Sequence, residues 1–420
     1  MPSMTSLLPL TASVAQICFA PLHQLLTQCS GQRRCPGLPD ADWLLLGLHR
    51  VLHESPTGRA FLQQHGFRWE NCPAVGHYFE ALKSSRRLEL AGELNLLLGR
   101  RLASSVSDPL AAYPERAGFD IHAGDRHWHG AAAHDAPIDG DKRAVGHFFA
   151  LDLRTHALRH LAVGKGKKEH DMHVLKRLDI ALLRNQAPAG RKVIYSWDKA
   201  GIDFPFWHRL KQGHGIYFIS LEKQNMKLEV QGLPSWDRED PLNAGVQQVE
   251  LVAGAAGVLL RRIEYVEPLT GKVLVFVTSE LTIRPGLIGF IYKLRWDIEK
   301  SFDQIKNKVG EKKAWGSSPT AKAMQAQFVC LLHNLLVLLE GRLQAEGVEN
   351  HAEARRREKE QTKAQARALE AGRIIPTPVL ALKRFSQRSV KLIRWLRSSL
   401  LDRLAYAAAT TRLTALYAVS

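Results

Sequence analysis

The segment RPGLIGFIYKLRWDIEKSFDQIKNKVG, residues 284–310, decides how the rest of the chain is interpreted. Its apolar residues recur at helical spacing and predict one continuous helix with a buried stripe: Ile291, Leu294, Ile298, Phe302, Ile305 and Val309. A second stripe spans about 60°, at about 100° per residue, and is polar: Tyr292, Arg295, Glu299 and Lys306. Such a helix buries its apolar face and keeps the polar stripe at the rim of a cleft.

The polar stripe suits metal-assisted chemistry on a phosphodiester, because a carboxylate binds a cation and basic side chains hold phosphate oxygens. Its four residues also fit the spacing Y-x2-R-x3-E-x6-K at every position. In this the chain resembles the DDE transposases of the insertion sequence four family. The resemblance implies a ribonuclease H-like domain with an Asp, Asp, Glu metal triad in which Glu299 is the glutamate. A surface helix with chance charges is the alternative interpretation.

A second segment, RKVIYSWDKAGIDFPFWHRLKQGHGIYFISLEK at 191–223, predicts strand, turn, helix and strand. Asp198 stands at the carboxyl end of the first strand, where ligands collect in open α/β sheets. The resemblance implies that Asp198 is the second aspartate of the triad. The family form D-x-G/A-x2-Y/F fits at Ala200 but not at Asp203, which stands where an aromatic residue is expected. Asp198 as a helix N-cap is the alternative.

The first aspartate belongs to the segment AGFDIHAGDRHWHGAAAHDAP at 117–137. Three candidates are available there: Asp120, Asp125 and Asp135. Because the family places this aspartate after a short apolar strand and before a small or polar residue, the resemblance favours Asp125, with Asp120 as the alternative. The segment also holds several histidines, interpreted as polar positions on a strand rim because no Cys/His pair with zinc spacing accompanies them: His122, His127, His129 and His134.

The wider pattern predicts an α/β fold in three regions. Residues 1–112 are expected to form a helical DNA-binding region, 113–345 the ribonuclease H-like catalytic domain, and 346–420 a basic helical region. Three antiparallel strands, a helix at 168–186 and the strand before Asp198 give the ribonuclease H-like order. Alternating apolar residues with Gly and Pro predict an inserted β-rich subdomain at about 222–278.

Composition indicates the partner. The 420 residues include 58 Lys and Arg against 41 Asp and Glu, a net charge of +17, which favours a polyanion. A basic stretch from Ala371 to Leu401 has no acidic residue and fits contact either with DNA or with a second protomer. The N-terminal region offers several basic side chains that could hold DNA or serve ordinary packing: Lys83, Arg86, Arg87, Arg100 and Arg101. Five cysteines without a CxxC pair suit a reducing compartment. No signal peptide or run of 18 apolar residues is seen, so no membrane role is expected.

The resemblance then implies a DNA transposase that cleaves transposon ends and transfers strands into target DNA by cut-and-paste. Asp125, Asp198 and Glu299 would hold two Mg²⁺ or Mn²⁺ ions. The DNA end would be held by the other residues of the polar stripe, namely Tyr292, Arg295 and Lys306. The expected partners are the transposon end repeats, target DNA and a second copy of the chain in a synaptic homodimer, and the expected location is the cytoplasm, at the nucleoid. A stand-alone metal nuclease and a domesticated non-catalytic DNA-binding protein are the alternatives.

Overall fold

The structure is a computed structural model that describes residues 11–33, 35, 37–53, 57–66, 72–137, 140–142, 144–164, 169–199, 202–309, 313–376 and 390–419. Within these ranges the side chains of Ala256, Lys306, Lys308 and Val309 are outside the described part. Ala200 and residues 377–389 of the basic stretch also lie outside it.

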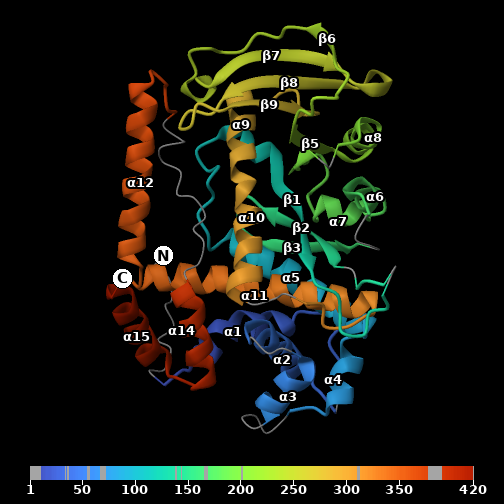
Figure 1. The fold of residues 1–420 in the computed structure, drawn as a ribbon, viewed down its shortest axis with the longest axis vertical. Coiled ribbons are helices and arrows are strands. Elements are labelled where there is room, and N and C mark those ends of the chain that lie inside the picture. The colour runs from blue at the N-terminus through green and yellow to red at the C-terminus, as the bar shows by residue number, and fades with distance from the viewer. Residues whose placement is uncertain are drawn as a thin grey trace.

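A mixed sheet runs through the centre of the described chain, and it has nine strands in the order β3-β2-β1-β4-β5-β9-β8-β7-β6 (Figure 1). Its first five strands are β1 (Phe119–His129), β2 (Val145–Asp152), β3 (Leu158–Val163), β4 (Lys192–Ser196) and β5 (Ile216–Leu221). β1, β2 and β3 pair antiparallel, whereas β4 lies parallel to both β1 and β5. The predicted ribonuclease H-like strand order is therefore confirmed.

The predicted β insertion is confirmed, and it extends the central sheet. Its strands are β6 (Glu229–Gly232), β7 (Val246–Ala253), β8 (Leu259–Val266) and β9 (Val273–Thr278). β9 returns to the main sheet and pairs antiparallel with β5, so that Ile219 lies opposite Thr278. β8, β7 and β6 then follow outward to the top of Figure 1.

Helices flank the sheet at both ends of the chain, as predicted. The N-terminal helices are α1 (Val14–Leu26), α2 (Asp40–Leu52), α3 (Gly58–Gly66), α4 (Val75–Ala81) and α5 (Ser85–Ala103). After the sheet come α9 (Pro285–Leu294), α10 (Trp296–Asp303), the π-helix η5 (Gln304–Val309), α11 (Pro319–Ala345), α12 (His351–Glu370), α14 (Val390–Leu401) and α15 (Tyr406–Ala418). Short 3-10 turns occur at η1 (Pro114–Gly118), η3 (Pro241–Asn243) and η4 (Ala255–Gly257).

The connections between strands contain α6 (Asp171–Lys176), α7 (Ile180–Arg184) and α8 (Phe204–His214). The prediction of a single helix at 168–186 is therefore wrong. The carboxylate of Asp179 accepts from the backbone N–H of Ala181 and starts a new helix, and Asn185 ends it in the left-handed region at φ 47°.

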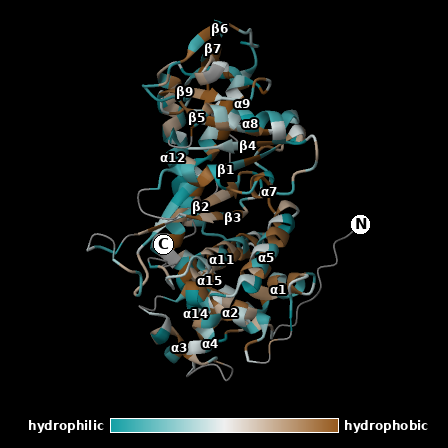
Figure 2. Cartoon of the chain, turned by 90° about the vertical axis from the view of Figure 1, so that its right-hand side faces the viewer, coloured by the Kyte–Doolittle hydropathy of each residue, from teal (hydrophilic) through white to brown (hydrophobic). Residues whose placement is uncertain are grey.

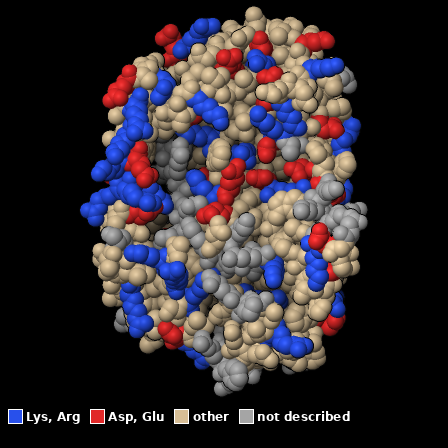
Figure 3. Space-filling view, in the orientation of Figure 1, with Lys and Arg blue, Asp and Glu red and all other residues tan. Residues whose placement is uncertain are grey.

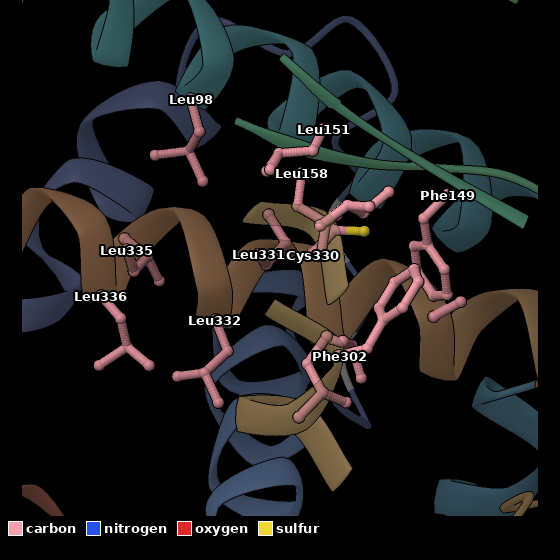
Figure 4. Close-up of a cluster of buried hydrophobic side chains, with 14 of the residues drawn as sticks. Leu98, Phe149, Leu151, Leu158, Phe302, Cys330, Leu331, Leu332, Leu335 and Leu336 are labelled. Atoms are coloured by element: carbon pink, nitrogen blue, oxygen red, sulfur yellow. The ribbon is translucent and has the colours of Figure 1, made fainter. Parts of the chain in front are cut away.

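Helix α11 is the centre of the main hydrophobic core. In Figure 4 its leucines lie between Leu158 of β3, Leu98 of α5 and Phe302 of α10. The side chain of Asn334 also accepts from the backbone N–H of Leu158 at 2.8 Å and donates to its carbonyl at 3.1 Å. Among the described helices α11 alone is long and apolar enough to cross a membrane, but 78% of its most apolar stretch is buried inside the protein. It is thus accounted for as a core helix.

Three of the histidines expected at a strand rim are buried instead, because apolar clusters cover both faces of the sheet. His122 lies against Tyr195. On the other face of β1, His127 stacks on Phe302 and His129 contacts His147. The rings of His129 and His147 are centred 4.7 Å apart, and Nδ1 of His147 lies 3.4 Å from Nε2 of His160. Only His134 of the predicted set is exposed.

Acid should unfold the protein through this histidine cluster. Burial, and then the neighbouring His127 and His160, lower the pKa of His129 to about 3. Burial likewise lowers the pKa of His160 to about 4. The unfolded chain takes up these protons near pH 6.5. Stability should therefore be full above about pH 6.5 and fall as the pH drops toward 4, by about 2 kcal/mol per histidine at pH 5.

Urea unfolding between pH 7.5 and 5 measures this loss. The unfolding free energy of the variant His129→Gln should depend less on pH. Its slope against pH should correspond to about one proton fewer than in the wild type. The exposed His134→Gln is the matched control and should keep the wild-type slope. An unchanged slope in His129→Gln would show that this histidine does not carry the acid sensitivity.

Candidate active site

The two aspartates at the strand ends come from neighbouring parallel strands. Ala123 of β1 pairs with Ser196 of β4, and Asp125 and Asp198 each follow two residues later. Because side chains alternate along a strand, Asp125 lies on the same face as Ala123. This face carries the main core, on which α10 packs. Helix α10 therefore brings Glu299 to the side of the sheet on which the aspartates lie.

Gly124 and Trp197 fix the position of these two strand ends. A Cβ atom on Gly124 would lie 2.2 Å from the nearest ring atom of Trp197, so the indole rests directly on the glycine backbone. Trp197 is buried and stacks on Tyr195, with ring centres 5.4 Å apart. The residue before Asp198 thus packs on the residue before Asp125, and only glycine allows so close an approach.

The helix that carries Glu299 is not continuous, so the prediction of one helix over 284–310 is wrong at Arg295. Here the backbone N–H of Arg295 bonds to the carbonyl of Tyr292, and that of Ile298 to the carbonyl of Arg295, three residues back in each case. These tighter turns separate α9 from α10. A wider π-helical turn, η5, then follows α10.

Arg295 lies between two of the predicted carboxylates. Its Nη2 donates to Oε1 of Glu299 at 2.7 Å, and its Nη1 lies 3.6 Å from Oδ2 of Asp125. The residue is only 5% exposed, and its Nε and Nη1 atoms have no hydrogen-bond partner. Arg295 therefore links β1 to α10. Its buried Nε and Nη1 groups can still donate hydrogen bonds to a ligand.

The charges of the predicted carboxylates interact. Burial raises the pKa of Asp125 to about 6. The backbone N–H of Arg126 and the guanidinium of Arg295 oppose this rise, and the negative charges of Glu299 and Asp198 add to it. Glu299 and Asp198 thus both lie within electrostatic reach of Asp125.

The carboxylate oxygens of this site are suitable ligands for divalent metal ions. Carboxylate oxygens are the ligands that Mg²⁺ and Mn²⁺ prefer, and a cation would offset the burial that raises the pKa of Asp125. The side chains of Asp125 and Glu299 are 23% and 37% exposed, so ions can reach them. Within the described part of the chain, however, no three His, Cys, Asp or Glu side chains already stand close enough together to hold a metal.

The alternative aspartates have structural partners elsewhere. Asp120 binds Arg191 at 2.8 Å and Arg154 at 3.6 Å near the start of β1. It lies five residues before Asp125, about 16 Å at about 3.3 Å per residue. Asp135 binds Lys322 at 2.9 Å. These contacts separate both aspartates from the carboxylates around Arg295.

Asp203 explains the departure from the family pattern after Asp198. Its carboxylate caps helix α8 by accepting from the backbone N–H of Phe206, and it also binds Lys176 at 2.5 Å. Asp203, rather than Asp198, is therefore the N-cap of α8. Asp198 is exposed at the sheet edge and remains accessible to a ligand.

Tyr292 and Lys306 complete the predicted set. Tyr292 does not lie at a cleft rim, because it is 5% exposed and its ring packs on Phe276 at 5.2 Å between ring centres. Its ring faces the guanidinium carbon of Arg295 at 5.4 Å, so it supports that side chain. The backbone of Lys306 belongs to η5, and its side chain is outside the described part.

Two residues of the site were missed in the sequence. Trp296 follows Arg295 and is 54% exposed, with its ring centre 5.6 Å from the guanidinium carbon. Its place outside the apolar stripe of the helix is a signal that could have found it. The role of Gly124 carries no such signal, because it depends on the distant Trp197.

The N-terminal arginines, for which the sequence allows either DNA contact or packing, are partly engaged in the fold. Arg86 makes two bonds of 2.7 Å to the carboxylate of Asp40, and Arg87 lies 3.2 Å from it. Arg101 donates to the side chain of Gln24 at 2.7 Å. At least Arg86 and Arg87 thus stabilise the contact between α2 and α5.

Comparison with known proteins identifies a family for this chain. A family model described as a transposase DDE domain matches residues 120–335, just over half of the 420 residues. The matched span includes Asp125, Asp198 and the segment from Tyr292 to Lys306. No curated protein gives a significant match to the sequence.

Proposed function

The chain belongs to the family of transposase DDE domains, and we propose that it cuts DNA at the ends of a mobile element and joins those ends to a target. The observation that carries the proposal is the contact of Arg295 with Glu299 and its approach to Asp125, whose charge also interacts with that of Asp198. The spacing Y-x2-R-x3-E-x6-K supports a place in the insertion sequence four group. Cut-and-paste excision, a synaptic homodimer and action on the bacterial nucleoid in the cytoplasm belong to the same proposal.

Asp125, Asp198 and Glu299 would hold two Mg²⁺ or Mn²⁺ ions. The chemistry supplied there is activation of the attacking water or 3′-hydroxyl and stabilisation of the leaving oxygen. The rigid packing of Trp197 on Gly124 keeps the two aspartates in register. Glu299 reaches them from α10, which the core residue Phe302 anchors.

Arg295 would hold a phosphate oxygen of the DNA end. Its buried Nε and Nη1 groups lack acceptors, and a planar guanidinium fits a phosphate with two parallel bonds. Tyr292 positions it from the core side, and the exposed indole of Trp296 offers a surface on which a base can stack. Lys306 is proposed to contact the phosphates that flank the cut.

Helix α12 extends the proposed DNA surface. Basic side chains gather over this helix in Figure 3, whereas a group of acidic side chains lies near the middle of the same face. An exposed basic residue recurs at every fourth position: Arg355, Lys359, Lys363 and Arg367. Residues four apart share one helix face, so these side chains span about 18 Å at about 1.5 Å per residue. Figure 2 shows α12 mostly hydrophilic, in keeping with its one buried residue, Ala368.

Neutralising this basic face should reduce the salt dependence of DNA binding. For Lys359→Gln with Lys363→Gln, the slope of log K against log salt should fall in magnitude by about 1.8, since each lost phosphate contact contributes about 0.9. Fluorescence anisotropy from 50 to 300 mM NaCl measures the slope. Glu358→Gln with Glu360→Gln is the matched control on the same helix and should bind at least as tightly as wild type. Equal slopes in the lysine variant and wild type would remove α12 from the DNA surface.

A strand-joining assay tests the proposed function. Labelled DNA that carries the terminal sequences flanking the reading frame is incubated with the protein, Mg²⁺ and a supercoiled plasmid. A transposase gives cleaved ends and then end–plasmid joints. Cleavage without joints would favour the nuclease, and metal-independent binding without cleavage would favour the non-catalytic DNA-binding protein.

A further inference from the structure

The guanidinium of Arg295 occupies the position where positive charge is needed between the proposed metal ligands. It contacts Oε1 of Glu299 at 2.7 Å and approaches Oδ2 of Asp125 to 3.6 Å. Both are carboxylate oxygens that a divalent ion would use. The described chain correspondingly has no three ligands already gathered for a metal. An ion that enters must therefore compete with this side chain for the same oxygen atoms.

The bonding of Arg295 is incomplete. Its Nη1 atom is too far from Asp125 for a hydrogen bond, and Nε also has no acceptor although both atoms are buried. A buried donor without an acceptor costs about 1–3 kcal/mol. A phosphate group supplies acceptors for these N–H groups and matches the planar fork of the guanidinium. Arg295 thus has a second partner available that would draw it from the carboxylates.

The aromatic rings around Arg295 allow such an exchange. Tyr292 lies on its core side, with the guanidinium carbon 5.4 Å from the ring centre, and Trp296 lies 5.6 Å away on the exposed side. Cation–π contacts of this kind hold a guanidinium without fixing its direction. A small rotation between the two rings can therefore exchange carboxylate for phosphate while the charge stays within the site.

We propose that Arg295 is an internal counter-ion that keeps the affinity of the free protein for divalent ions low, and that a DNA phosphate draws it away so that metal and DNA bind cooperatively. This inference rests on the proposed function, because it takes DNA as the substrate. It means that the nuclease centre is completed only on DNA. By linkage, the factor by which DNA raises metal affinity equals the factor by which metal raises DNA affinity.

Mn²⁺ binding, followed by electron paramagnetic resonance, tests the proposal without any turnover. The DNA is a pre-cut end with a 3′-dideoxy terminus, and a titration of DNA alone is subtracted. In wild type, DNA should tighten Mn²⁺ binding by about tenfold or more, within the usual range of coupling. Arg295→Gln should bind Mn²⁺ about tenfold more tightly than wild type without DNA, and DNA should then add little.

Matched variants distinguish the direct contact of Arg295 with the carboxylates from a general effect of positive charge near the site. Lys300→Gln removes a positive charge next to Glu299, but this lysine binds Asp297 at 2.6 Å, so its change in Mn²⁺ affinity should be much smaller. Arg295→Met repeats the test with an apolar side chain of similar length, and circular dichroism checks the fold of each variant.

Two failures are distinguishable. If Arg295→Gln and Arg295→Met bind Mn²⁺ no more tightly than wild type without DNA, the counter-ion proposal is wrong while the metal site stands. If neither wild type nor the variants show Mn²⁺ binding that Asp198→Asn removes, with or without DNA, the proposed metal site fails and the inference fails with it.

Discussion

Replacement of Glu299 by glutamine should reduce strand cleavage by about 10³-fold or more, while the affinity for DNA ends remains within about threefold of wild type. The amide has nearly the same shape but cannot carry the negative charge that holds a cation. Loss of one metal ligand removes several kcal/mol of transition-state stabilisation, and about 4 kcal/mol corresponds to 10³ in rate. Single-turnover cleavage and anisotropy measure the two quantities.

Asp120→Asn is the matched control for this variant. Asp120 is a carboxylate on the strand that carries Asp125, but it is held by Arg191 and Arg154 outside the site. The variant Asp120→Asn, checked for correct folding, should therefore cleave DNA at close to the wild-type rate. Loss of cleavage in Asp120→Asn together with activity in Asp125→Asn would reverse the assignment of the first aspartate.

Replacement of Gly124 by alanine should have the second large effect. The added Cβ would stand 2.2 Å from the ring of Trp197, which is buried within the second apolar cluster. Such overpacking costs about 1–3 kcal/mol of unfolding free energy. Because the clash separates the strand ends that carry Asp125 and Asp198, cleavage should fall by about 10²-fold, as for a 1 Å displacement of reacting groups.

A double-mutant cycle identifies the cause. Trp197→Leu with Gly124→Ala should be more stable than the sum of the single effects predicts, since the smaller side chain leaves room for the methyl group. Gly99→Ala serves as the control. Gly99 lies in helix α5, and its added Cβ would meet the side chain of Ala157 at an ordinary contact distance of 3.5 Å. Additive effects in the cycle would show that the contact between Gly124 and Trp197 does not position the site.

The parts of the fold that follow local patterns could be predicted from the sequence. Alternating residues predicted β1 to β3 and the inserted strands, a short apolar run predicted β4, and Asp198 could be placed at a strand end because that run stops there. The pairing of β9 with β5, which fuses the insertion to the main sheet, joins residues about 60 positions apart. No local pattern encodes such a pairing.

The residues of the candidate site could be proposed from the sequence, but their geometry could not. An ideal helix over 284–310 places Tyr292 and Glu299 on one rim, whereas the tight turns at Arg295 leave Tyr292 in the core. The approach of Arg295 to Asp125 depends on how α10 packs on β1, which side-chain spacing along one helix cannot reveal. The histidines of β1 looked polar in the sequence, but apolar clusters cover both faces of the sheet. His122 lies against Tyr195 of the second cluster, whereas His127 lies against Phe302 of the main core.

The central claim is that Asp125, Asp198 and Glu299 form one metal centre for DNA cleavage. The most direct measurement is anomalous scattering from Mn²⁺ in crystals of the protein bound to a pre-cut, 3′-dideoxy DNA end. The account predicts anomalous peaks within ligand distance of these three carboxylates, with Arg295 turned to a DNA phosphate. Peaks at other side chains, or none near Asp198 and Glu299 in a complex that cleaves an uncut end, would contradict it.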